Sequence, residues 1–320
     1  MEQTMAKKNK YEIDMCNGTI MDKLISFSLP LMLSGILQLM FNAVDIIVVG
    51  RFSGSQALAA VGSTSALINV FTNLFIGISL GANVLTARFY AAGREKEVSE
   101  TVHTAITLAL VSGIIMALVG LVFSKGALAL MGTPDDVIEL SALYMRIYFL
   151  GMPFFMLYNY GAAILRAVGD TKRPLLFLMI AGVINACLNM VLVIVFKLGV
   201  AGVAIATVIS QMISCVLVLR CLCRSESSYR LRFSELGMKG YYLKQIFSVG
   251  VPAGIQSTVI NFSNVLLQSS VNSFGSTAMA GYTAANNLLG FLYVSVNSIT
   301  QACMSFTSQN YGVGKLKRMD

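Results

Sequence analysis

Eight long apolar stretches limit the folds open to this chain more than any other feature. They cover residues 24–50, 58–86, 101–123, 137–164, 174–196, 200–220, 246–272 and 277–306. About 20 mostly apolar residues are enough for a helix to cross a bilayer. Only 12% of the 320 residues are charged and the mean hydropathy is +0.74, whereas soluble domains carry about a quarter charged residues. The sequence therefore predicts an all-α polytopic membrane protein.

The basic residues predict how the chain is oriented in the membrane. If the N-terminus is cytoplasmic, 19 of the 23 Lys and Arg residues fall in cytoplasmic segments, as expected for a membrane protein. The first 23 residues are polar, and the apolar stretch that follows is too long for a cleaved signal peptide. We therefore expect a retained first helix and a cytoplasmic N-terminus. Membrane orientation explains the net charge of +8, so no nucleic-acid partner is expected.

An internal repeat predicts two related halves. The motif at Ser26–Pro30 matches Ser248–Pro252 at an offset of 222, and an offset of 221 later pairs Tyr90 with Tyr311. Six helices, an even number, separate the two starts, so both repeats enter the membrane from the same side and are parallel. A complete second copy would need about twice 222 residues, so we expect a C-terminally truncated chain.

The repeat divides the chain into four parts. They are a cytoplasmic N-terminal segment at 1–23, an N-lobe of six helices at 24–220, a cytoplasmic inter-lobe linker at 221–245, and a partial C-lobe of two helices at 246–320.

Asp45 is the candidate for a functional ionisable group. The other 14 of the 15 acidic residues lie in termini, loops or helix ends, whereas Asp45 lies inside an apolar stretch. A charge inside the bilayer costs about 2.5 kcal/mol or more, so it is usually functional. Gln38 and Asn42 share a helical face with Asp45, and we expect this face to line a polar cavity. The alternative is that Asp45 reaches water at the outer end of its helix.

Amide pairs at helical spacing recur in later stretches. Asn185 and Asn189 are four residues apart, as are Thr207 and Gln211, so each pair lies on one helical face. With Asp45 they form a candidate cage, unless the amides only hold helices together. Further polar residues suited to the wall of a wetted cavity are Asn261, Asn264, Gln268 and Asn297.

Glycine and proline predict local features of the helices. Gly77-x-x-x-Gly81 has the spacing that lets two membrane helices approach closely, and it favours helix packing over ligand contact. Pro30, Pro153 and Pro252 lie within or open apolar stretches, where proline can kink a helix.

Five segments in the same order resemble those of the multidrug and toxic compound extrusion (MATE) transporters. They are Val44–Arg51, Ala87–Glu95, Leu165–Pro174, Gly199–Thr207 and Gln309–Gly312. The resemblance implies two parallel six-helix repeats forming a V-shaped 12-helix carrier, of which about eight helices are present here. It also implies secondary active efflux of organic, often cationic drugs or toxins by alternating access, in antiport with H⁺ or Na⁺.

The resemblance also implies four ion-coupling residues. The family's aspartate on the first helix, its pair on the fifth and its threonine on the sixth correspond to Asp45, Asn185, Asn189 and Thr207, which would also ligate a bound Na⁺. The family often has an acid where this chain has Asn189. Asp45 is therefore expected to carry nearly all of the charge and to act as the coupling carboxylate. No cofactor other than H⁺ or Na⁺ is expected.

These inferences define the expected partners and location, and they leave three alternatives open. We expect small organic cations or amphiphiles as substrates, and a monomer in the lipid bilayer of a bacterial cell membrane. One alternative is a lipid-linked precursor or polysaccharide flippase of the same superfamily, which should have a cationic cavity, whereas these helices contribute only Arg146. A membrane enzyme is the second, but the single His103 leaves no zinc ligand set. The third is a non-transporting truncated fragment.

Overall fold

The structure, a computed structural model, describes residues 11–272 and 276–319, except for the side chains of Ser63, Ala66 and most of 261–288. Within this part the chain forms nine α-helices. They are α1 Ile20–Phe52, α2 Gly54–Ala91, α3 Glu95–Leu130, α4 Asp135–Leu150, α5 Met152–Ala167, α6 Lys172–Met190, α7 Gly199–Cys223, α8 Gly240–Asn272 and α9 Ser276–Gly312. A π-helical turn, Val191–Val195, extends α6, and short 3₁₀ turns cover Phe233–Glu235 and Leu316–Arg318.

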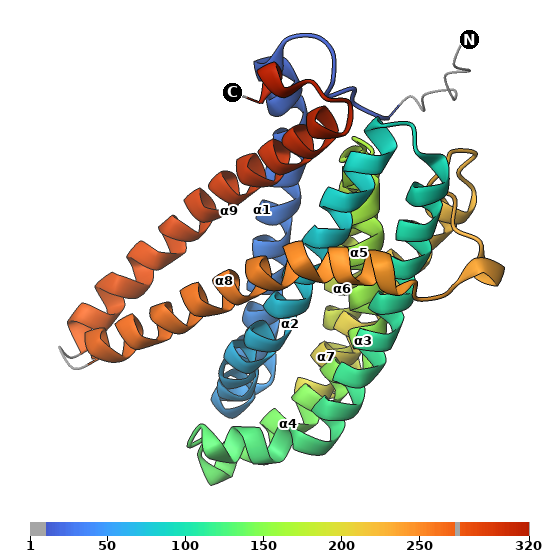
Figure 1. The fold of residues 1–320 in the computed structure, drawn as a ribbon. Helices are drawn as coiled ribbons and strands as arrows, with labels where there is room; N and C mark the ends of the chain where they lie inside the picture. The colour runs from blue at the N-terminus through green and yellow to red at the C-terminus, as the bar shows by residue number, and fades with distance from the viewer. Residues whose placement is uncertain (1–10, 273–275, 320) are drawn as a thin grey trace, which may run out of the picture.

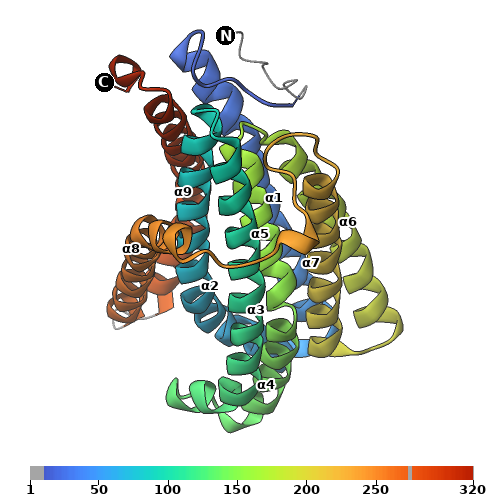
Figure 2. The same cartoon turned by 45° about the vertical axis from the view of Figure 1, so that its right-hand side comes forward.

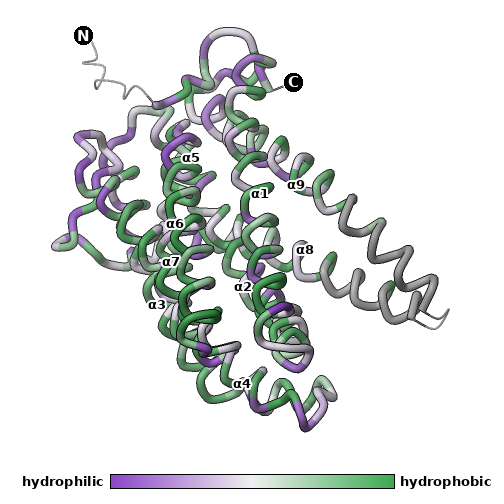
Figure 3. Tube along the Cα trace, turned by 180° about the vertical axis from the view of Figure 1, so that it is seen from behind, coloured by the Kyte–Doolittle hydropathy of each residue, from purple (hydrophilic) through white to green (hydrophobic). Residues whose placement is uncertain are grey.

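Helices α1 to α3 and α5 to α7 run side by side in one bundle, and α4 lies across one end of it (Figures 1 and 2). Among the described residues, five helices are long and apolar enough to cross a membrane, or six if α4 and α5 form one broken span. Hydrophilic residues gather mainly at the helix ends and loops, and apolar residues run along the helices (Figure 3). Large apolar side chains such as Val122 and Phe123 are 70% and 63% exposed, as expected for a surface that faces lipid.

The span predicted for residues 137–164 corresponds to two helices, because the chain breaks at Gly151 into α4 and α5, which are bent by 48° and can form one broken span. Pro153 has no backbone N–H, and its ring in a continuous helix would clash with the carbonyl of Phe149, four residues before. The N–H groups of Phe154 and Phe155 instead bond the carbonyl of Gly151, both at 3.1 Å.

The α8–α9 pair repeats the α1–α2 pair. Shifting α1 by the 222-residue offset gives 242–274, and shifting α2 by 221 gives 275–312, close to the bounds of α8 and α9. Helices α1 and α8 each have 33 residues and carry an internal proline. The spans predicted at 246–272 and 277–306 therefore coincide with helices. These two are long, but they are less apolar than the six spans described above.

The two lobes diverge as a V in Figure 1. Near the described chain ends, α9 lies close to α1, whereas the end of α8 and the beginning of α9 lie away from the other helices (Figure 1). The V is therefore closed at one end. We call this the basic end, because the segments around residues 92–94, 168–171, 224–239 and 313–319 lie there with their Lys and Arg residues.

Helix α8 crosses α2 where the two backbones touch. A Cβ atom at Gly77 would lie 2.2 Å from the Cα of Gly254, and one at Gly81 would lie 2.2 Å from the carbonyl oxygen of Ile246. Gly250 is equally crowded on α8. The Gly77-x-x-x-Gly81 pair thus packs against a second pair four residues apart, which confirms the helix-packing interpretation and joins the two lobes.

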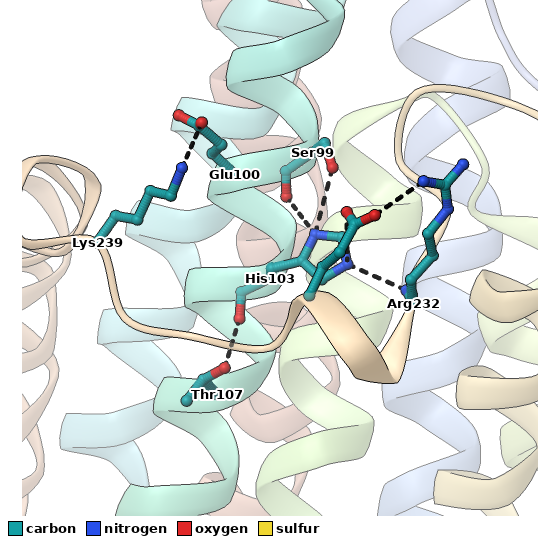
Figure 4. A network of polar contacts seen from close by, with 7 residues as sticks. Ser99, Glu100, His103, Thr107, Arg232 and Lys239 are labelled. Atoms are coloured by element: carbon teal, nitrogen blue, oxygen red, sulfur yellow. Dashed lines mark hydrogen bonds and ion pairs between the residues drawn. The ribbon is translucent and has the colours of Figure 1, made fainter.

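The linker between α7 and α8 is fastened to the first turns of α3 (Figure 4). The N–H of Arg232 donates to Nε2 of His103 at 3.0 Å, and Nδ1 of His103 lies 2.7 Å from the carbonyl oxygen of Ser99. A carbonyl can only accept, so the imidazole has its hydrogen on Nδ1. Lys239 adds an ion pair with Glu100. Together these contacts fix the path of the linker toward α8.

The α2–α8 crossing predicts a different effect for two glycines of the same helix. Gly77→Ala should lower the free energy of unfolding by about 1 to 3 kcal/mol, because the added methyl group has no space. Gly62→Ala is the matched control, since nothing lies within 4 Å of a Cβ there and alanine favours the helix by up to about 1 kcal/mol. Thermal unfolding of both purified variants in lipid nanodiscs checks the prediction. Equal melting temperatures would contradict it.

Candidate functional site

Asp45 lies where α1 packs against α6, and its carboxylate accepts a hydrogen bond from the side-chain amide of Asn189. The same amide nitrogen also donates to Oδ1 of Asn185 at 3.2 Å. Asn189 is fully buried and Asn185 is 5% exposed, whereas Asp45 is half-buried. The carboxylate is therefore held by a buried amide on one side and retains access on another.

The polar cluster continues from α6 to α7. Nδ2 of Asn185 donates to Oγ of Ser210 at 3.5 Å, and this hydroxyl donates to the backbone carbonyl of Thr207 at 2.8 Å. The hydroxyl of Thr207 donates to the carbonyl of Val203 at 2.9 Å, so Thr207 joins the cluster through its backbone. Ser210 is a member that the sequence analysis missed. Its spacing of three residues from Thr207 on one helix could have indicated it.

The cluster has an acceptor atom with no partner. Oδ1 of Asn189 is buried and has no hydrogen bond within the described part of the chain. An unpaired buried amide oxygen costs about 1 to 3 kcal/mol, so a site that keeps one is suited to a ligand that supplies the missing interaction. Carboxylate, amide and hydroxyl oxygens are also the ligands that hard cations prefer.

Two tyrosines of α4 form the wall beside this cluster. The rings of Tyr144 and Tyr148 are stacked, with centroids 6.1 Å apart and an interplanar angle of 30°. The charge of Asp45 acts on both phenols, and Tyr148 lies beside Gln211 of α7. The sequence analysis placed Gln211 in the cavity but missed this pair, although two tyrosines four residues apart share a helical face.

The other predicted cavity residues are not in this cluster. Gln38 and Asn42 on α1 and Asn297 on α9 are exposed. The side chains of Asn261, Asn264 and Gln268 lie outside the described part of the structure. The structure therefore brings together the four predicted ion-coupling residues, Asp45, Asn185, Asn189 and Thr207, but does not bring Gln38, Asn42 or Asn297 into contact with them.

The donor set favours a proton or a weakly held monovalent ion. Within the described ranges, no group of three or more His, Cys, Asp or Glu side chains could hold a metal. A tightly bound Ca²⁺ or Zn²⁺ usually takes several charged or nitrogen and sulfur ligands, whereas this cluster combines one carboxylate with neutral oxygens.

Comparisons with known proteins agree with this architecture. The family model MatE matches residues 30–191 and 252–320, which include Asp45, Asn185 and Asn189. The probable multidrug resistance protein YoeA of Bacillus subtilis is 35% identical over 302 residues, covering 92% of this chain and 65% of that protein. An FAD transporter of Shewanella oneidensis is 24% identical over 300 residues, covering 92% of this chain and 66% of that protein. The chain thus spans about two thirds of the length of these relatives.

A solved structure confirms the fold. A multidrug resistance MATE family transporter of the MOP superfamily, solved in an outward-facing conformation, superposes with a TM-score of 0.90 at 22% identity. The superposition covers 98% of this chain and 70% of that transporter. Since the family model also matches most of the chain on both sides of the inter-lobe linker, the chain belongs to the MatE family of multidrug and toxic compound extrusion transporters.

Proposed function

We propose that this chain forms the ion-coupling lobe of a secondary active exporter, in which Asp45 couples the exit of small organic cations to the entry of H⁺ or Na⁺. The observation that carries the proposal is the bond between the Asp45 carboxylate and the fully buried Asn189 amide, beside an unpaired amide oxygen. Multidrug relatives support organic molecules as the class of substrate.

The chemistry of the cluster favours a cationic substrate over an anionic one. None of the described hydrogen-bond partners in the cluster is a Lys or Arg side chain, and Arg146 on α4 is exposed. The stacked Tyr144 and Tyr148 rings offer π faces that attract cations. The names of the relatives differ in substrate, since one is an FAD transporter and another is a probable multidrug resistance protein. A flippase for anionic lipid-linked precursors would need cationic groups where this cluster has Asp45.

Protonation of Asp45 would change the hydrogen bonding around it. A carboxylate only accepts hydrogen bonds, whereas a protonated carboxyl group can also donate one. In the deprotonated state the amide of Asn189 donates to Asp45. In the protonated state the new O–H finds its acceptor in Oδ1 of Asn189 once the amide turns, which also breaks the Asn189 bond to Asn185. A proton thereby removes the charge that attracts the substrate and rearranges the contact between α1 and α6.

A sodium ion would act on the same atoms. Asp45 supplies the charge, and the side-chain oxygens of Asn189, Asn185 and Ser210 are the neutral ligands that the cluster offers, with Thr207 close by. Ion and organic cation then compete for one carboxylate, which is the condition for exchange. The basic end is the cytoplasmic side in this proposal, and the open end of the V faces outward.

Replacing Asp45 tests the coupling role. Asp45→Asn should weaken binding of the lipophilic cation tetraphenylphosphonium at least about tenfold, because the variant loses the one charge of a partly desolvated site. It should also abolish substrate-dependent ion flux in proteoliposomes in which pH and Na⁺ are varied separately. Equilibrium dialysis measures the binding, so the test stands even where a chain of this length does not transport.

The matched control is Asp22→Asn, which removes an exposed carboxylate from the first turn of the same helix and should change neither readout. Unchanged cation binding together with ion-driven exchange in the Asp45→Asn protein would refute Asp45 as the coupling group.

Replacing Asn189 tests how the single carboxylate sets ion affinity. Asn189→Asp places a second carboxylate beside Asp45, and two like charges this close favour a bound cation or proton between them. We expect Na⁺ or H⁺ to bind about tenfold more tightly than to the natural protein, as measured by competition with tetraphenylphosphonium. Asn189→Leu keeps the side-chain size but removes both the donor and the unpaired oxygen. Equal ion affinity in the two variants would disprove a direct role of Asn189.

A further inference from the structure

Residues 11–18 precede α1 and lie across the basic end; we call them the N-terminal strap. The Glu12 carboxylate accepts hydrogen bonds from the hydroxyls of Tyr90 at 2.7 Å and Tyr229 at 2.9 Å. Tyr90 belongs to α2, and Tyr229 belongs to the inter-lobe linker. One charged side chain of the strap thus joins two parts of the chain that are 139 residues apart.

The first half of the strap is also fixed to the loop between α5 and α6. The N–H of Ile13 donates to the carbonyl of Gly169 at 3.2 Å. Gly169 has a φ of +94°, and a Cβ atom there would lie 2.4 Å from the carbonyl oxygen of Ile13. The strap therefore rests directly on glycine backbone, and the guanidinium of Arg173 lies 5.5 Å from the ring of Tyr11.

The second half of the strap is fixed to the other lobe. Nδ2 of Asn310, near the end of α9, donates to the carbonyl of Met15 at 3.1 Å. Beyond α9, Nζ of Lys315 donates to the carbonyl of Cys16 and to Oδ1 of Asn17, both at 2.8 Å. Met15 is fully buried and packs in a small apolar cluster with residues of α1 and α9.

The strap lies over a seam where α9 meets the N-lobe. Oγ of Ser305 donates to Oδ1 of Asn83 on α2 at 3.2 Å, and Nε2 of Gln309 donates to the carbonyl of Ala167 on α5 at 2.7 Å. All three side chains are less than 5% exposed. Separation of the lobes at this end would have to break these bonds as well as those of the strap.

The partners of Glu12 are suited to a strong contact. Hydrogen bonds to an ionised group are roughly twice as strong as bonds between neutral groups. Burial raises the pKa of the Tyr229 phenol, and the Glu12 charge raises it further, so Tyr229 stays a neutral O–H donor at physiological pH. Tyr229 is fully buried, and its hydroxyl therefore has no bulk water to replace Glu12.

We infer that the N-terminal strap is a latch across the closed end of the V, anchored by Glu12, which holds the two lobes together while the opposite end is open. This inference depends on the alternating access of the proposed function. When the lobes open toward the basic end, the strap has to detach from them. The latch assigns Glu12 a positioning role, since the residue fastens the strap to α2 and to the inter-lobe linker through Tyr90 and Tyr229 and lies in a different segment from the Asp45 cluster.

Hydrogen exchange measured by mass spectrometry on the full chain in nanodiscs tests the latch. In Glu12→Gln the amide group keeps one acceptor oxygen but replaces the other with a donor and removes the charge, so the contact with the two phenols is weakened. Exchange should rise about tenfold in residues 11–18 and also in 305–312 of α9. Residues 125–140 at the opposite end should not change. Glu226→Gln is the matched control, because it removes an exposed carboxylate from the same linker.

Tyr229→Phe removes a single hydroxyl from the same contact. It is the variant to use if Glu12→Gln raises hydrogen exchange throughout the chain. Faster exchange confined to residues 11–18 in both variants would overturn the latch, because the strap would then be a surface segment that does not hold the lobes. The readout needs neither substrate nor ion, so it is independent of the Asp45 experiments.

Discussion

The hydrocarbon of a bilayer offers no hydrogen bonds, so polar side chains within the helices must find partners in the protein. Most hydroxyls here bond a carbonyl of their own helix, as Thr72 does to Ile68 at 2.8 Å and Ser34 to Pro30 at 2.8 Å. The side-chain amides of Asn189 and Asn185 instead reach a carboxylate and a hydroxyl group on other helices. The bonds from Asn189 to Asp45 and from Asn185 to Ser210 therefore both hold α1, α6 and α7 together and create the candidate ion site.

This difference explains what could be predicted from the sequence. Asn185 and Asn189 share one face because of helical period alone, and the repeat offset placed α8 and α9 without any tertiary information. Helical spacing places Ser210 beside Thr207 and Tyr144 beside Tyr148, but they were missed because the sequence does not say which other helix each of these faces meets. Proline marked the region of the α4–α5 break. The bend of 48° at this break also depends on how α3 packs against it. A Cβ atom at Gly113 of α3 would lie 2.5 Å from the Cα of Pro153, so α3 touches the chain directly beside the break.

The motif at Leu165–Pro174 indicated the family, and its residues now have a structural role. Gly169 adopts a left-handed conformation that glycine reaches at little cost. The carboxylate of Asp170 accepts a hydrogen bond from the backbone N–H of Arg173 at 3.1 Å and forms an ion pair with its guanidinium. It thereby gives a partner to one of the backbone N–H groups that a helix leaves free in its first turn, here that of α6. This motif shapes the loop on which the strap rests and lies apart from the Asp45 cluster. A family signature can thus mark a folding requirement of the closed end.

Helix α1 connects the two sites. The strap leads directly into Ile20, and Asp45 lies 25 residues further along the same helix, about 38 Å at 1.5 Å per residue. Pro30 lies between them and removes one backbone hydrogen bond from α1, so this helix is easiest to bend at the part nearest the strap. A change in the contact between Asp45 and α6 therefore acts on the helix whose other end, through Phe27 and Leu31, packs with Met15 and Phe306 at the closed end. Ion binding and closure are carried by different residues, and α1 is the element common to both.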